Sequence, residues 1–225
     1  DLVFFESLSK FSLELKEKET REVLETKFEL VEEGEQFLVK IEIPDATKAG
    51  AGYELHARVF DTGGNSCDIY FEFVGFNDRI PQVIINEIQT EYSKPRVEFI
   101  ELFCETEGNI GGMFLYNAGD GEKLAYTFPP VEVEAGEYIL LHYRSLPEED
   151  IVDELFALDE SGGAYSHPEA RDFWIPENKA RLPKSDVVLL KSSFMGDLMD
   201  AVLYSESDKT EWKTEELKNA ARRAF

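Results

Sequence analysis

Two glutamates, Glu87 and Glu101, are the first candidates for chemistry, because each lies in a segment that alternates apolar and polar residues. Alternation places Glu101 and Phe99 on one face of a strand and Glu98 on the opposite face. Whichever face is turned to the core, one of the two glutamates must therefore lie against apolar side chains. A carboxylate in such surroundings can act as a general acid or base. No nucleophile, histidine or second acid stands nearby at motif spacing. We therefore favour a structural role, in which Glu87 and Glu101 accept hydrogen bonds from backbone amides or from an arginine such as Arg96.

The three histidines do not belong to a known catalytic or metal-binding motif. His56 and His142 fall within predicted strands and His167 falls in a loop, so each is expected to be an exposed or hydrogen-bonded residue rather than a ligand. Walker, His-Glu-x-x-His, EF-hand and Gly-x-Ser-x-Gly patterns are all missing from the sequence. A triad assembled from distant residues stays open as an alternative, because its members need not be close in sequence.

No cofactor is predicted. Cys67 and Cys104 have no Cys-x-x-Cys partner, which removes the usual basis for structural zinc, and we expect two buried free thiols rather than a disulfide. Calcium stays open, because hard cations need only clustered oxygens. The weak candidates for calcium are Asp159–Glu160 and Asp120–Glu122.

The chain is strongly acidic, with 47 Asp and Glu against 23 Lys and Arg and a formal net charge of −24 over 225 residues. It lacks the Lys/Arg surface that phosphate neutralisation requires, so nucleic acid and anionic lipid are disfavoured as direct partners. Since no apolar stretch reaches about 18 residues, no transmembrane segment is predicted. The chain opens on Asp1 rather than Met, which favours a processed export product or a trimmed fragment.

Alternation with a period of two runs through most of the chain and predicts an all-β protein made of two tandem immunoglobulin-like β-sandwiches. Residues 1–79 are expected to form the first sandwich and residues 80–225 the second. Pro81 suits the boundary between them, because proline cannot donate to a strand ladder.

The second sandwich is expected to carry a short helical insertion within residues 144–185, where apolar residues of the 147–158 segment recur at helical spacing. A C-terminal helix is predicted over 214–224, with Thr214 as its cap.

The same insertion holds the candidate partner-binding residues Tyr165, Arg171, Phe173 and Trp174. Aromatic side chains on a loop can stack on a sugar ring or anchor a protein partner. We favour the alternative, in which Phe173, Trp174 and Ile175 pack as a lid on the open end of the sandwich.

Two parts of the sequence resemble known modules. Residues 53–73, with the turn Thr62-Gly63-Gly64-Asn65, resemble the final hairpin of bacterial immunoglobulin-like domains. Residues 81–205 resemble the lamin-tail domain family through seven short segments in family order. These segments are 85–88, 97–102, 112–115, 126–129, 135–141, 186–190 and 200–204.

The lamin-tail resemblance implies an immunoglobulin-like sandwich in an exported, envelope-associated bacterial protein. We therefore expect a non-catalytic binding or spacer protein that is periplasmic, on the cell surface or extracellular, and that engages a protein or glycan partner. The alternative is an enzyme, or the accessory module of a secreted nuclease or glycan-active hydrolase. That alternative predicts a polar cleft joining Glu87 or Glu101 to His142 or His167.

Overall fold

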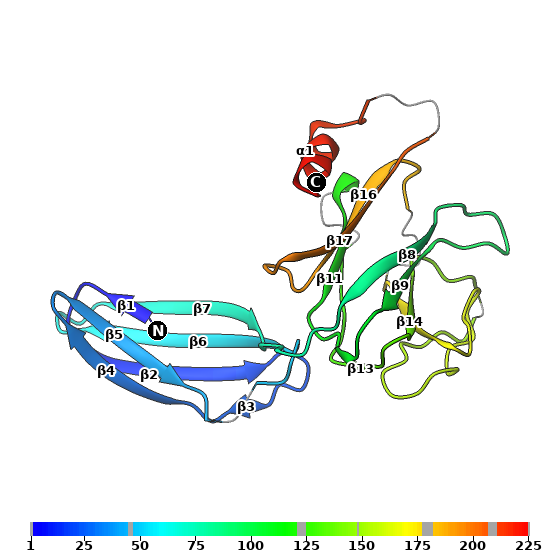
Figure 1. The fold of residues 1–225 in the computed structure, drawn as a ribbon. Helices are drawn as coiled ribbons and strands as arrows, with labels where there is room; N and C mark the ends of the chain where they lie inside the picture. Colours follow the sequence, from blue (N-terminus) through cyan, green and yellow to red (C-terminus); the bar gives the residue numbers. More distant parts are fainter. Residues whose placement is uncertain are drawn as a thin grey trace. The chain divides into compact units, whose positions relative to one another are not determined.

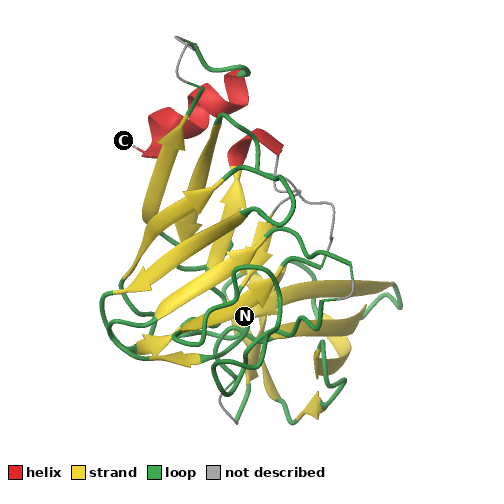
Figure 2. Ribbon diagram, turned by 90° about the vertical axis from the view of Figure 1, so that its right-hand side faces the viewer, coloured by secondary structure: helices red, strands yellow, loops and turns green. Residues whose placement is uncertain are grey.

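The structure is a computed structural model, which describes residues 2–44, 47–120, 125–147, 149–176, 182–206 and 211–224. Strands are the main regular structure of the described residues, which form several sheets and one α-helix, and this agrees with the prediction of an all-β protein. The chain divides into two compact units, Asp1–Phe76 and Asn77–Phe225. Each unit is described by itself (Figures 1 and 2).

The first unit contains a four-stranded sheet in the order β3-β2-β6-β7 and a three-stranded sheet in the order β1-β5-β4 (Figure 1). Its strands are β1 (Leu2–Phe4), β2 (Leu8–Glu17), β3 (Val23–Leu24), β4 (Lys27–Glu33), β5 (Gln36–Glu42), β6 (Gly52–Asp61) and β7 (Ser66–Val74). Alternate residues of β2 and β6 face the core, where Leu15 and Ala57 are fully buried together with Val39 of the other sheet. Period-2 alternation thus gives each sheet one apolar face.

The second unit is built on two four-stranded sheets, in the orders β15-β14-β9-β8 and β12-β11-β16-β17, and a small β10-β13 pair. All strand pairs are antiparallel except β14 and β15, which are parallel. The strands are β8 (Val83–Gln89), β9 (Phe99–Cys104), β10 (Gly108–Asn109), β11 (Phe114–Asn117), β12 (Ala125–Thr127), β13 (Glu132–Val133), β14 (Tyr138–His142), β15 (Ala170–Trp174), β16 (Asp186–Lys191) and β17 (Leu198–Tyr204). A short 3₁₀ helix covers Ala118–Asp120.

The two large sheets of the second unit share one core. Ile100 and Leu141 of one sheet are fully buried against the same cluster as Leu115 and Leu190 of the other. Burying a side chain of this size stabilises a fold by about 1.5–3 kcal/mol. The sheets therefore pack face to face, and their outer faces are left for other contacts.

Helix α1 (Glu215–Ala224) confirms the predicted C-terminal helix. Thr214 Oγ1 accepts a hydrogen bond from Leu217 N at 3.3 Å, as expected of an N-cap. Leu217 and Ala221 are buried against Val187 and Leu189 of β16, so α1, drawn in red in Figure 2, covers part of the outer face of that sheet.

The insertion at residues 144–185 differs from the prediction. No helix forms in the described residues of the 147–158 segment, and strand β15 (Ala170–Trp174) adds to the edge of a sheet instead. The apolar spacing was misleading because Leu155 and Phe156 are exposed, Phe156 by 92%. The prediction of a short helical insertion is therefore wrong.

Both cysteines are free thiols. Cys104 is buried in the core of the second unit, where burial and the nearby Glu137 charge raise the pKa of its thiol to about 12. Cys67 is exposed, so the expectation of two buried thiols is wrong for this residue. It lies on β7, which is an edge strand of its sheet and pairs with β6.

One carboxylate links the two large sheets of the second unit. Asp200 of β17 accepts a hydrogen bond from Ile85 N of β8 at 2.7 Å, at the point where a β-bulge shifts the register of β8. The bulge takes this amide out of the regular ladder, and Asp200 supplies its acceptor.

We expect Asp200→Ala to lower the free energy of unfolding of the second unit by about 1–3 kcal/mol, because the Ile85 amide loses its acceptor. Asp197→Ala removes an exposed carboxylate near the start of the same strand and should change the free energy by less than about 0.5 kcal/mol. Urea denaturation of both variants measures the difference. Equal stability of the two variants would contradict the linking role of Asp200.

Candidate functional site

Edge strand β15 is completed by side chains of the insertion rather than by another strand. Asp172 N donates to Glu154 Oε2 at 2.9 Å, and Trp174 N donates to Asp153 Oδ1 at 2.8 Å. Glu154 N in turn donates to Asp172 O at 3.0 Å. The carboxylates occupy amides that would otherwise be available for pairing with another chain.

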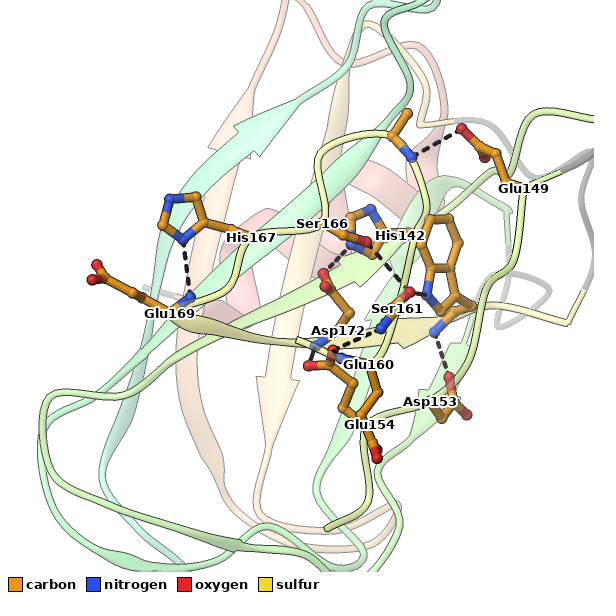
Figure 3. Close-up of polar contacts among 12 residues, drawn as sticks. His142, Glu149, Asp153, Glu154, Glu160, Ser161, Ser166, His167, Glu169 and Asp172 are labelled. Atoms are coloured by element: carbon orange, nitrogen blue, oxygen red, sulfur yellow. Dashed lines mark hydrogen bonds and ion pairs between the residues drawn. The ribbon is translucent and has the colours of Figure 1, made fainter. Parts of the chain in front are cut away.

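Glu154 is the central residue of this arrangement and is fully buried. Its Oε1 accepts hydrogen bonds from Glu160 N at 2.8 Å and Ser161 N at 3.0 Å, in addition to the bond from Asp172 to Oε2 (Figure 3). A buried carboxylate is costly unless it is hydrogen-bonded, and three amide donors offset that cost. One side chain therefore fixes the 155–161 segment to β15.

A second set of contacts lies beside Glu154 and includes His142, one of the three histidines considered in the sequence. His142 Nε2 lies 2.6 Å from Asp172 Oδ1, and the imidazole stacks on the Trp174 ring at a centroid distance of 4.0 Å. Trp174 Nε1 donates to Ser161 Oγ at 3.0 Å. His142 and Asp172 have side chains 0% and 1% exposed, so this pair has no direct access to a ligand at the surface.

The loop that leads to β15 is fixed at its start and at its tip. Glu149 accepts a hydrogen bond from Leu146 N at 2.6 Å. It accepts a second one from Ala164 N at 2.9 Å (Figure 3). Gly163 packs so closely on Trp174 that a Cβ would lie 2.1 Å from the indole ring. Glycine is therefore required here, and the loop lies directly on the sheet.

Tyr165 follows in the left-handed region, with φ of 68°, and its ring lies 5.4 Å from that of Phe99. This conformation is uncommon for a bulky residue and indicates that the surrounding contacts determine it. The loop thus holds an aromatic side chain over the outer face of the β15-β14-β9-β8 sheet.

A groove of about 440 Å³ lies where the loop ends on that outer face. The lining residues come from all four strands and from the loop, and they are Asn86, Phe99, Glu101, Tyr138, Leu140, Tyr165, His167, Glu169 and Ala170. Phe99, Leu140 and Ala170 are buried and form one apolar cluster. The groove therefore has an apolar floor and polar walls.

Two polar contacts order the walls. Asn86 Nδ2 donates to Glu101 Oε1 at 2.6 Å, so the amide nitrogen holds the carboxylate in place. Glu169 N donates to His167 Nδ1 at 3.2 Å (Figure 3). Since Nδ1 acts as an acceptor, a neutral His167 ring carries its proton on Nε2.

The candidate partner-binding residues separate into two groups. Tyr165 is 42% exposed and lines the groove, whereas Phe173, Trp174 and Arg171 are 0%, 6% and 6% exposed. Phe173 faces the core and Arg171 donates to Glu137 Oε1 at 2.7 Å. These three residues support the site from beneath and do not offer a surface to a partner.

The two structural carboxylates also differ. Glu101 is half-buried and bonded to Asn86, not to Arg96, which pairs with Glu91 at 3.1 Å. Glu87 is exposed beside the β8 bulge, because the bulge turns its side chain out of the alternation that the sequence implied. The glutamate buried in this region is Glu98, which accepts a hydrogen bond from Arg144 Nε at 3.1 Å.

Sequence reasoning missed Asn86, Tyr138 and Glu169 as groove residues, because nothing in the sequence placed their segments side by side. The calcium candidate Asp159–Glu160 lies in the loop, and in the pair Asp120–Glu122 the second residue lies outside the described residues. Within the described ranges no three His, Cys, Asp or Glu side chains are grouped as a metal site would need.

Comparison with known proteins places the second unit in a family. The model of a family described as a protein second domain, TP_1001_2nd, matches residues 81–225. The chain belongs to the TP_1001 second-domain family.

An uncharacterized protein of Treponema pallidum (strain Nichols) is 31% identical over 151 residues, which are 67% of this chain and 38% of that protein. The chain thus spans well under half the length of this relative. A solved structure of a DUF4876 family protein from Bacteroides thetaiotaomicron VPI-5482 is 12% identical in sequence. The match covers 91% of this chain and 76% of the Bacteroides chain, with a TM-score of 0.36.

Membership of the TP_1001 second-domain family overturns the resemblance to lamin-tail domains, because the matched family covers the same residues and no lamin-tail domain is indicated. The seven segments on which that resemblance rested are mostly short alternating strands. Such strands recur in antiparallel sheets of many families, and their order alone does not separate one family from another.

We expect Glu154→Gln to lower the free energy of unfolding of the second unit by about 2–4 kcal/mol, because an amide cannot accept all three backbone hydrogen bonds. Hydrogen exchange should accelerate at the amides of Ser161 and Asp172. Glu160→Gln, a change at an exposed neighbouring glutamate, is the matched control and should leave both measurements close to wild type. Unchanged exchange in Glu154→Gln would show that the carboxylate does not hold the loop.

Proposed function

We propose that this protein is a non-catalytic binding module of the bacterial cell exterior or envelope, and that it engages a protein or glycan partner through the groove on the outer face of the β15-β14-β9-β8 sheet. The observation that carries the proposal is the placement of Tyr165, an exposed aromatic residue held by a fixed loop above an apolar floor. Exposed aromatic side chains in well-ordered sites contribute much of the affinity of many interfaces.

The order of the site supports binding. The bonds from Glu149, Glu154 and Ser161 fix the loop in this structure, so little conformational entropy remains to be lost when a partner binds. Polar groups with defined positions, among them Glu101 and Asn86, can then determine which partner fits.

The cellular location and the assignment of both units as immunoglobulin-like sandwiches belong to the same proposal. A net charge of −24 suits a protein that stays apart from nucleic acid and from anionic membrane surfaces. As a separate finding, no described helix is long and apolar enough to cross a membrane. We take both units as immunoglobulin-like sandwiches in tandem, with the first as a spacer. Two facing sheets with a shared core in each unit support this assignment.

A second candidate function is hydrolysis, as an enzyme or as the accessory module of one, because Glu101 and His167 line the same groove. The contacts favour binding instead. Glu101 is bonded to Asn86, His167 Nδ1 accepts a backbone amide, and the described groove residues include no serine or cysteine nucleophile. Cleavage of a bound oligosaccharide that stops in Glu101→Gln would favour the second candidate.

We expect Tyr165→Asn to weaken ligand binding at least tenfold, which corresponds to about 1.4 kcal/mol, because it removes the aromatic contact. Asparagine is the chosen replacement since it tolerates a positive φ better than most residues. Parallel arrays of bacterial surface glycans and of synthetic peptides, probed with labelled protein, measure the change. Tyr70→Asn, at a tyrosine of the first unit that is 60% exposed, is the matched control.

Retention of every array signal by Tyr165→Asn would contradict the proposed site. Loss of the same signals in Tyr70→Asn would show that the binding depends on the first unit and not on the groove.

A further inference from the structure

The charges that line the groove all have one sign. Its ionised side chains are the carboxylates of Glu101 and Glu169, and no lysine or arginine lines it among the described residues. One of the two N–H donors of the Asn86 amide is bonded to Glu101. The formal charge of the described walls, which are free of lysine and arginine, is therefore negative.

The aromatic residues are arranged to complement that charge. The ring of Tyr165 lies against that of Phe99 at a centroid distance of 5.4 Å. The ring of Tyr138 lies against that of Phe103 at 5.0 Å. Tyr138 and Tyr165 are 38% and 42% exposed, so both rings remain accessible. Aromatic rings beside carboxylates favour a cation, which gains from the ring quadrupole as well as from the charge.

The volume of the groove and the net negative charge of the protein also favour a cationic ligand. A volume of about 440 Å³ falls within the range of small-ligand sites and can hold a long side chain with the backbone on either side of it. The net charge of −24 attracts cations over a distance and repels anions.

We infer that the groove recognises a lysine- or arginine-bearing segment of a partner protein. The cationic head group lies between the Glu101 and Glu169 carboxylates, and the apolar stem of the side chain lies on Phe99 and Leu140. This inference rests on the proposed function, since it names the ligand class of the same groove. A neutral glycan, whose hydroxyl groups could also donate to Glu101, is the competing ligand class.

The test is isothermal titration calorimetry with acetyl-tetralysine amide, compared with the same peptide whose lysine side chains are acetylated. Acetylation removes the charge and keeps the length of the peptide. We expect binding of the charged peptide to wild-type protein, at least tenfold weaker binding of the acetylated peptide, and loss of affinity as the salt concentration rises.

Two double variants separate the groove from the general charge of the protein. Glu101→Gln/Glu169→Gln should weaken the binding of the charged peptide at least tenfold. Glu29→Gln/Glu32→Gln changes the net charge by the same amount at two exposed glutamates of the first unit and should leave binding within about twofold of wild type.

Equal weakening in both double variants would overturn the inference, because it would mean that the peptide is attracted by charge alone. No binding of the charged peptide would overturn it as well. If a neutral glycan binds, is lost in Tyr165→Asn and is unaffected by Glu101→Gln/Glu169→Gln, the ligand class is wrong while the proposed function stands. If Tyr165→Asn weakens no ligand at all, the proposed function itself fails.

Discussion

The burial of one carboxylate, that of Glu154, is the constraint on which the candidate site depends. A carboxylate with no access to water must receive hydrogen bonds, and Glu154 receives three from backbone amides. Those amides belong to two separate segments, the loop at residues 160–161 and strand β15 at Asp172. Satisfying the charge therefore requires the loop to lie against the strand.

Several features of the second unit follow from that contact. The edge of β15 is closed by the loop, so it is not available to pair with another chain. Trp174 is covered by the loop through its bond to Ser161 and its close contact with Gly163, and His142 and Asp172 are enclosed beneath. Tyr165 is then placed at the boundary between the covered and the open parts of the sheet. The groove lies at this boundary, and its position is a consequence of where the loop ends.

The sequence was sufficient for the elements whose signal is local. Alternation predicted an all-β protein, and Thr214 as an N-cap predicted helix α1. The helix predicted in the insertion does not form, because the apolar residues at helical spacing, such as Leu155 and Phe156, are exposed. The hydrogen bonds of Glu154 hold this segment instead. Among the candidate site residues, Tyr165 lines the groove, whereas Phe173 and Trp174 lie in a strand whose pairing with β14 is determined by contacts distant in sequence. The lamin-tail resemblance failed for a related reason, since alternation reports a sheet and not a family.

The central claim is that the groove bounded by Tyr165, Glu101 and Glu169 is where the protein meets its partner. Amide chemical-shift mapping of the isotope-labelled protein with acetyl-tetralysine amide tests this claim most directly. We expect the largest shifts to cluster at the amides of Phe99, Glu101, Leu140 and Ala170, which line the groove, and to saturate together. Shifts spread evenly over the acidic strands of both units, or concentrated around α1, would contradict it.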